Sequence, residues 1–281
     1  MDYTEWVGNT DSQRDSMAPE QLQKFEAMMN RQADSVTGGS ELSLCSHWAY
    51  FSPAVQTSDL TVQGYPRDES FMPPIELASR LWLGGRLEFK EPLVTGTPAD
   101  RFSTIIKAEE KESERGKRFY LSAQHQISAK GSVSIREIQH FLYRERSEKG
   151  AHPTRSQPMD VDPDWQKTTK PDSILLFRFS ALTSNAHRIH YDQEFAREVE
   201  GYPNVVVHGP LLLLLALEAF KNKHDGKVIE WVDYQITGPV YLGEQITIAG
   251  KIVDNHTCDL RICGPDNKLS LKARVKWKYS W

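Results

Sequence analysis

Apolar and polar residues alternate along the first half of the chain from about Arg86 onwards, which predicts β-strands. Four segments alternate in this way: 86–96, 100–112, 118–130 and 133–145. Glycine and charged residues separate them, as they do in hairpin turns. Four successive strands joined by hairpins predict an antiparallel sheet.

The second half shows the same alternation of apolar and polar residues after residue 227. Alternating segments here span 228–243, 244–254, 257–264 and 268–281. An apolar run, SILLFRFSAL at 173–182, predicts a further strand that opens this half. Gly209 to Phe220 predicts an apolar helix whose run Leu211–Leu217 suits a buried core helix. This run is far shorter than the roughly 18 consecutive apolar residues of a membrane span.

Two other segments predict helices. Residues 18–32 place Pro19 at a helix start and four apolar side chains on one face, namely Leu22, Phe25, Met28 and Met29. IELASRLWL, residues 75–83, predicts a helix ahead of the first sheet. Residues 50–60 and 62–74 are expected to form irregular segments, without helix or strand, that cover a core.

An internal repeat relates the two halves. FKEPLVTG (89–96) matches ITGPVYLG (236–243), with Pro92 over Pro239 and Gly96 over Gly243. In each copy a predicted helix precedes this segment and three strands follow, which favours a duplication. We expect an N-terminal half at 1–146, a proline-rich linker at 147–172 and a C-terminal half at 173–281.

Composition narrows the class of protein. The formal net charge of −4 gives no sign of a nucleic-acid or membrane partner. The N-terminus lacks the features of a secretory or transit signal, and the three cysteines contain no C-x-x-C pair. We therefore expect buried thiols in a cytoplasmic protein. Nucleotide-loop, zincin and nucleophile-elbow motifs are absent, so neither a cofactor nor a metal is expected.

Two stretches concentrate candidate chemistry. TSNAHRIHYDQEF (183–195) places His187 and His190 beside Asn185, and EGYPNVVVHGPLL (200–212) contains Gly209 at the start of the apolar helix. A histidine near pH 7 can accept or deliver a proton. A turn in which both histidines satisfy backbone groups is the ordinary alternative.

Together with WVG (6–8) and residues 72–96, these stretches resemble the double-hotdog hydratases and dehydratases of the MaoC-like group. The resemblance is to hydroxyacyl-thioester dehydratase type 2 and to mesaconyl-CoA hydratases in particular. It implies an α+β double hotdog, with two antiparallel sheets that each wrap a central helix. It also implies a hydro-lyase that hydrates or dehydrates the α–β bond of a 3-hydroxyacyl or enoyl thioester.

The resemblance assigns roles to single residues. His190 corresponds to the family's acid–base histidine, and Asn185 stands where the wider group has an aspartate. The type 2 dehydratases show a similar N-x-H-R-I-H-Y string, so the asparagine fits a subfamily feature. An amide moves no proton, but it can position water or a hydroxyl by donating and accepting. The backbone N–H at Gly209 would hold the enolate oxygen.

Other residues are expected to bind the substrate. They are His187, Arg188, Tyr191, His208, Trp82 and Pro74, the last beside Pro73. Several candidate residues have an ordinary alternative. Arg188 suits a salt bridge, Tyr191 suits packing and His208 suits a simple helix start, while Gly209 suits close packing.

Three alternatives remain open. A hotdog enzyme could act on a hydrophobic biosynthetic intermediate without a thioester, by elimination, isomerisation or cyclisation. A non-catalytic binding paralogue is the second, although it would be expected to lose His190. A thioesterase fits least, because only Glu218 near the helix end supplies a carboxylate. The expected partner is a small molecule, acyl-CoA, acyl-carrier-bound or free, and a homodimer is left open.

Overall fold

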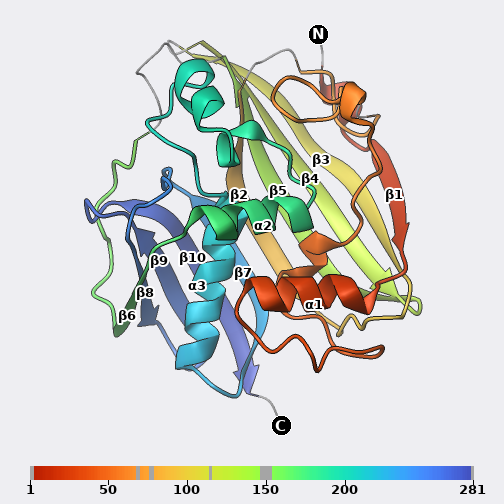
Figure 1. Cartoon of the computed structure of the whole chain (residues 1–281), viewed down its shortest axis with the longest axis vertical. Coiled ribbons are helices and arrows are strands. Elements are labelled where there is room, and N and C mark those ends of the chain that lie inside the picture. Colours follow the sequence, from red (N-terminus) through yellow and green to blue (C-terminus); the bar gives the residue numbers. More distant parts are fainter. Residues whose placement is uncertain (1–2, 68–69, 76–78, 114–115, 146–153, 280–281) are drawn as a thin grey trace. The chain divides into compact units, whose positions relative to one another are not determined.

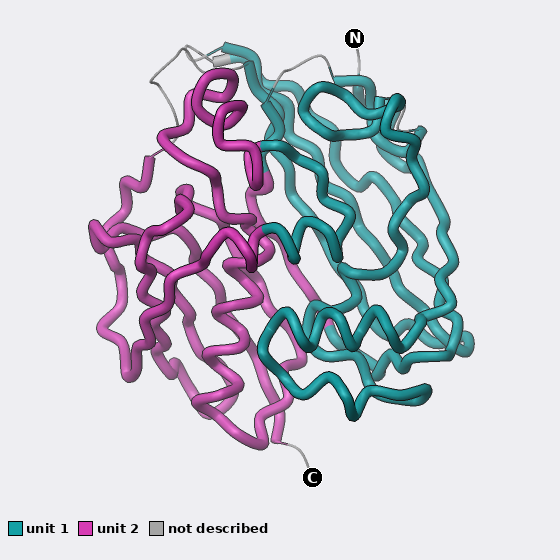
Figure 2. Tube along the Cα trace, in the orientation of Figure 1, with its two compact units in different colours: residues 1–81, 89–145, 177–188 teal, residues 82–88, 146–176, 189–281 magenta. Residues whose placement is uncertain are grey.

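The computed structural model describes residues 3–67, 70–75, 79–113, 116–145 and 154–279 of the chain. The chain forms two compact units that are not continuous in sequence (Figure 2). Unit 1 comprises Met1–Leu81, Phe89–Glu145 and Phe177–Arg188. Unit 2 comprises Trp82–Glu88, Arg146–Leu176 and Ile189–Trp281.

Unit 1 is built on an antiparallel sheet with the strand order β1-β3-β4-β5 (Figure 1). Its strands are β1 (Thr10–Asp15), β3 (Ala99–Ser113), β4 (Gly116–Ala129) and β5 (Ser132–Arg144). The last three confirm the predicted hairpin series, and their alternating side chains bury one face of the sheet.

Helix α1 (Pro19–Met28) and short 3-10 turns accompany this sheet. The turns are η1 (Tyr3–Trp6), η2 (Ser46–Ala49) and η3 (Thr57–Asp59). The helix confirms the prediction for 18–32 and buries Leu22, Phe25 and Met28. It begins at the proline, whose missing N–H costs nothing in a first helical turn.

The buried face of the unit 1 sheet also carries a polar cluster. Glu137 on β5 is 2% exposed, accepts hydrogen bonds from Trp48 Nε1 (3.0 Å) and Gln139 Nε2 (2.9 Å), and lies 3.2 Å from His47 Nε2. Although burial opposes it, the interaction with His47 lowers the pKa of this carboxyl to about 2. The η2 turn is thereby tied to the sheet.

Unit 2 wraps an antiparallel sheet around helix α3 (Gly209–Lys223) (Figure 1). The strand order is β2-β7-β10-β9-β8-β6. Its strands are β2 (Ser79–Phe89, of which 82–88 belong to this unit), β6 (Trp165–Thr169), β7 (Lys227–Ile236), β8 (Ile246–Ile252), β9 (Thr257–Cys263) and β10 (Leu269–Tyr279).

Helix α3 is buried because its side chains are mostly apolar. Leu211 to Leu214 are each at most 1% exposed, and the ring of Phe220 packs 5.3 Å from that of Trp277 on β10. Burial of a leucine contributes roughly 1.5–3 kcal/mol, so this run is a principal source of the unit's stability. The predicted buried helix is confirmed.

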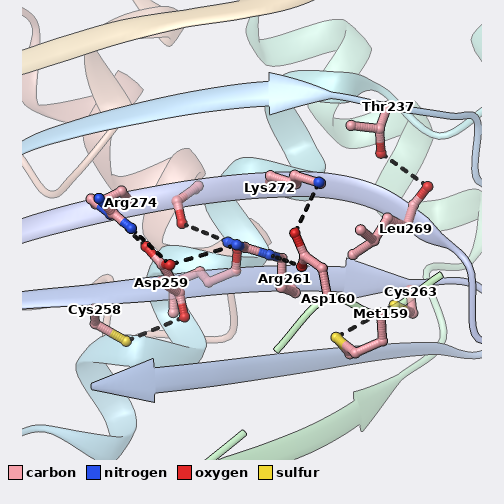
Figure 3. Close-up of polar contacts among 12 residues, drawn as sticks. Met159, Asp160, Thr237, Cys258, Asp259, Arg261, Cys263, Leu269, Lys272 and Arg274 are labelled. Atoms are coloured by element: carbon pink, nitrogen blue, oxygen red, sulfur yellow. Dashed lines mark hydrogen bonds and ion pairs between the residues drawn. The ribbon is translucent and has the colours of Figure 1, made fainter. Parts of the chain in front are cut away.

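The opposite side chains of β9 and β10 form a charged ladder (Figure 3). Asp259 accepts two hydrogen bonds from Arg274, at 2.6 and 2.9 Å. Arg261 donates to Asp160 at 2.6 Å, and Lys272 reaches the other oxygen of the same carboxylate at 2.9 Å. Cross-strand pairs of opposite charge stabilise a sheet, and here they cover the face turned away from α3.

The sequence repeat is also a structural repeat. Strands β2 and β7 end at Phe89 and Ile236, and β3 and β8 begin at Ala99 and Ile246, so each pair keeps the offset of the sequence match. Between them each copy makes an isolated bridge and a turn with a positive-φ glycine, 74° at Gly96 and 87° at Gly243. The repeated segments are connections, however, and not the strands that the alternation predicted.

Three other predictions differ from the structure. SILLFRFSAL forms helix α2 (Ser173–Leu182) instead of a strand. Of the expected helix 75–83, residues 79–83 lie in β2, and 76–78 are outside the described residues. Within the expected linker, β6 pairs with β8.

The three cysteines are free and buried, as expected of inert thiols. Burial raises the pKa of Cys258 to about 12 and that of Cys263 to about 11, so both stay protonated. In the described part of the chain, no helix is long and apolar enough to cross a membrane.

Candidate functional site

The stretch that carries the candidate chemistry follows α2 and includes the 3-10 turn η4 (Arg188–His190). Unit 1 ends at Arg188 and unit 2 resumes at Ile189. Asn185, His187 and Arg188 therefore belong to unit 1, and His190 with the residues after it belongs to unit 2. The two groups are described in turn.

Asn185 is held in a tight turn after α2. Ser184 has a positive φ of 51°, and the backbone N–H of Asn185 donates to Ser180 O at 2.9 Å. The side-chain Oδ1 accepts the backbone N–H of His187 at 3.1 Å. Of the two polar atoms of the carboxamide only the oxygen can accept a hydrogen bond, so this contact fixes the orientation of the side chain. The Nδ2 group, a hydrogen-bond donor, therefore points away from the His187 N–H.

A loop from far earlier in the chain holds this turn in place. Arg188 donates its backbone N–H to Gln63 O at 3.0 Å and its Nη1 to Val62 O at 3.2 Å. Gly64, with φ at 96°, approaches so closely that a Cβ would overlap the carbonyl of Ala186. These bonds give Arg188 a role in fixing the loop, and its contact with the substrate stays a prediction.

His187 is 6% exposed and pairs with a residue that the sequence did not single out. Its Nδ1 lies 2.6 Å from Tyr65 Oη, and the two ring centroids are 4.6 Å apart. The guanidinium of Arg80 lies 5.0 Å from the Tyr65 ring centroid. Glycine within TVQGY signals a turn at 61–65, but nothing local connects that turn to residue 187.

Pro74, expected at the substrate groove, is exposed.

His190 is buried in unit 2 with a defined tautomer. Its Nδ1 lies 2.8 Å from the carbonyl oxygen of Val206 and the side chain is 8% exposed. A carbonyl can only accept, so Nδ1 carries the proton and Nε2 carries the lone pair. Burial lowers the pKa of His190 to about 4 against the raising effect of the Val206 bond. The imidazole is therefore neutral near pH 7.

His208 lies directly on His190. The rings stack at 3.8 Å between centroids with 23° between planes, and His208 is fully buried. A small apolar cluster fixes the segments that carry both: Ile189, Phe195, Tyr202 and Val206, with Tyr241 packed against them. Val206 N also donates to Ile189 O at 2.9 Å. The sequence thus predicted two residues that unit 2 brings together.

Gly209 is the first residue of α3, followed by Pro210. Amides in a first helical turn have no acceptor within the helix and lie at the positive end of its dipole. A Cβ on Gly209 would sit 3.2 Å from both Cγ1 and Cδ1 of Ile236. The glycine therefore suits both an oxyanion-binding start and close packing.

Two further expected residues have other surroundings. Trp82 Nε1 donates to Gly84 O at 3.1 Å and to Tyr234 Oη at 3.0 Å, which gives it a place in the β2–β7 pairing. Tyr191 is 50% exposed. Among the described residues, no group of three histidine, cysteine or carboxylate side chains could hold a metal ion.

Comparisons with known proteins identify the family of the chain. A family model for hydroxyacyl-thioester dehydratase type 2 matches residues 45–242. Mesaconyl-C(4)-CoA hydratase of Chloroflexus aurantiacus is 33% identical over 275 residues, which cover 98% of each chain. Mitochondrial hydroxyacyl-thioester dehydratase type 2 of Schizosaccharomyces pombe is 26% identical and covers 76% of this chain and 81% of its own.

A solved structure shows the same fold. The MaoC-like dehydratase from Phytophthora capsici has a TM-score of 0.72 with 14% identity, over 97% of this chain and 96% of its own. The predicted double-hotdog fold class is therefore confirmed.

Proposed function

The chain belongs to the hydroxyacyl-thioester dehydratase type 2 family and is a hydro-lyase, and on this premise we propose that it acts on an acyl-CoA with His190 as the acid–base group. The carrier is inferred from the Chloroflexus relative, whose name specifies a CoA ester. That relative matches the chain almost end to end, which favours a thioester over a free biosynthetic intermediate.

The observation that carries the proposal is the tautomer of His190. With Nδ1–H bound to Val206 O at 2.8 Å, the basic lone pair lies on Nε2. A pKa near 4 keeps the imidazole in its proton-accepting form at neutral pH. In dehydration, Nε2 takes the Cα proton, the electron pair forms the enolate, and the same proton then leaves with the Cβ hydroxyl as water. Hydration is the reverse sequence.

Two other residues are assigned supporting roles in this reaction. Asn185, through Nδ2, donates a hydrogen bond to the hydroxyl or water oxygen. The backbone N–H at Gly209 stabilises the enolate oxygen, where a helix start favours negative charge. Both assignments rest on the family register, and the amide orientation and the helix start support them.

The test is a steady-state assay of the purified protein with a panel of enoyl-CoA and 3-hydroxyacyl-CoA esters. Wild type is expected to interconvert at least one pair, and His190→Ala is expected to lose about 10²- to 10⁴-fold in kcat with unchanged circular dichroism. His256→Ala, which removes an exposed histidine of the same unit, serves as the control. A folded His190→Ala variant within threefold of wild type would remove His190 from the mechanism.

A further inference from the structure

The pair formed by Tyr65 and His187 ties an early loop to the candidate turn, and both residues lie in unit 1. The 2.6 Å separation of Tyr65 Oη and His187 Nδ1 is short for a hydrogen bond between neutral groups. His187 is 6% exposed, and a bond in such surroundings is stronger than one in water. Water therefore competes little for this contact.

The direction of the bond follows from the charge beside the phenol. The guanidinium of Arg80 lies 5.0 Å from the ring centroid of Tyr65. A cation over the ring withdraws electron density and strengthens the phenol O–H as a donor. We therefore assign the proton to Tyr65, which donates to Nδ1, so His187 carries its own ring proton on Nε2.

His187 passes this constraint to Asn185. The backbone N–H of His187 donates to Asn185 Oδ1 at 3.1 Å, which is the bond that orients the carboxamide. A histidine ring fixed at Nδ1 limits how far its backbone can rotate. The N–H then stays aimed at Oδ1, and Asn185 Nδ2 keeps its direction.

The loop itself is rigid enough to serve as an anchor. Tyr65 accepts the Thr61 N–H on its carbonyl at 2.6 Å and donates its own N–H to Thr61 Oγ1 at 3.1 Å. Gly64 lies against Ala186, and Gln63 O binds the Arg188 N–H at 3.0 Å. Side chain and backbone of this loop thus hold the turn from two sides.

We infer that Tyr65 is a positioning residue of the hydro-lyase site, and that it acts through His187 on the carboxamide of Asn185. The inference rests on the function proposed above for Asn185. It explains why a residue so far away in sequence makes a short bond beside the motif.

The first test compares Tyr65→Phe with Tyr50→Phe. Tyr50 is also in unit 1, is 4% exposed and donates its hydroxyl to Ala18 O at 2.9 Å, so the control removes an equivalent bond away from the motif. Tyr65→Phe is expected to lower kcat about tenfold with KM within about twofold, and Tyr50→Phe to leave both unchanged. Equal activity of Tyr65→Phe and wild type would overturn the inference.

A double-mutant cycle separates positioning from a general loss of structure. In an Asn185→Ala background, adding Tyr65→Phe is expected to lower kcat by less than about twofold, because the group it positions is already absent. If the tenfold loss persists in that background, Tyr65 does not act through Asn185 and the inference is wrong.

A measurement that needs no activity completes the test. Nitrogen-15 NMR of histidine-labelled protein reports the ring tautomer, and we expect His187 to be protonated at Nε2 in wild type and in Tyr50→Phe. Tyr65→Phe should change that signal. An unchanged signal would contradict the pairing. If instead the NMR pairing holds while wild type converts none of the thioesters, the proposed function fails and the Tyr65–His187 link stands.

Discussion

At the scale of single residues, protonation and amide orientation define the candidate chemistry. The sequence predicted His190 and Asn185 from a motif, but not which atom of each is available. The Val206 carbonyl fixes the His190 tautomer, and the His187 N–H fixes the Asn185 carboxamide. Backbone groups from elsewhere in the fold supply the first of these, so only the structure could reveal it.

Asn185→Asp separates the two uses of this side chain. A carboxylate oxygen can still accept the His187 N–H, so the turn should keep its shape. The Nδ2 group, a donor, is replaced by a second carboxylate oxygen, a charged acceptor. We therefore expect kcat to fall at least about tenfold. Asn267→Asp, in a positive-φ turn of unit 2, controls for the added charge. Undiminished hydratase activity would mean that the site works with an aspartate, as in the wider group.

At the scale of elements, alternation predicted most strands, whereas the two apolar runs gave one correct helix, α3, and one wrong strand, SILLFRFSAL. Strands β3, β4, β8, β9 and β10 lie where period-two alternation predicted them. SILLFRFSAL has no such period, and an apolar run of this length suits a buried strand or a helix equally well. The deciding signal was Asp172, whose Oδ1 accepts the N–H of Leu175 at 2.8 Å as a helix N-cap does.

The start of α3 allows oxyanion binding to be separated from packing. Gly209→Ala is expected to lower kcat/KM at least about tenfold, or about 1.4 kcal/mol, because a side chain there obstructs the substrate carbonyl. Its Cβ would also press on Ile236 at 3.2 Å and cost some stability. The measurement is a thermal melt paired with a steady-state assay.

Ile236→Val supplies the matched control for that variant. Removing Cδ1 costs about 0.5–1.5 kcal/mol by itself, and it takes away one of the two Ile236 atoms that the new Cβ would press on. In the Gly209→Ala/Ile236→Val double variant we expect the glycine change to cost less stability than it does alone, while activity stays as low as in Gly209→Ala. Should activity return together with stability, the glycine is needed only for packing, and the oxyanion role must be withdrawn.

At the scale of the whole molecule, the repeat shows what sequence can and cannot reveal. Eight matched residues located the equivalent connections of both halves, since each ends in a turn that requires a positive φ. Yet the copies have diverged in their interiors. Unit 2 buries the leucines of α3, whereas the sheet of unit 1 buries Glu137 and places His125 close to it. Alternation predicts which face of a strand is covered, but not that a carboxylate such as Glu137 lies on that face.

One histidine in each unit makes stability depend on pH. Burial lowers the pKa of His125 in unit 1 and that of His190 in unit 2 to about 4. For His125, Glu137 opposes this shift, while Arg101 and His47 reinforce it. The unfolded chain binds protons near pH 6.5, so the folded form is fully favoured above that pH. Its stability falls as the pH drops from about 6.5 towards 4.

We expect each histidine to remove about 2 kcal/mol of unfolding free energy between pH 7.5 and 5, as measured by urea denaturation. His125→Gln should lower stability at pH 7.5 but lose about 2 kcal/mol less than wild type on acidification. His256→Gln, at an exposed site, should keep the full wild-type pH dependence. A His125→Gln variant with that same full dependence would show that His125 is already neutral in the unfolded chain or charged in the folded one. Either result would contradict the burial argument.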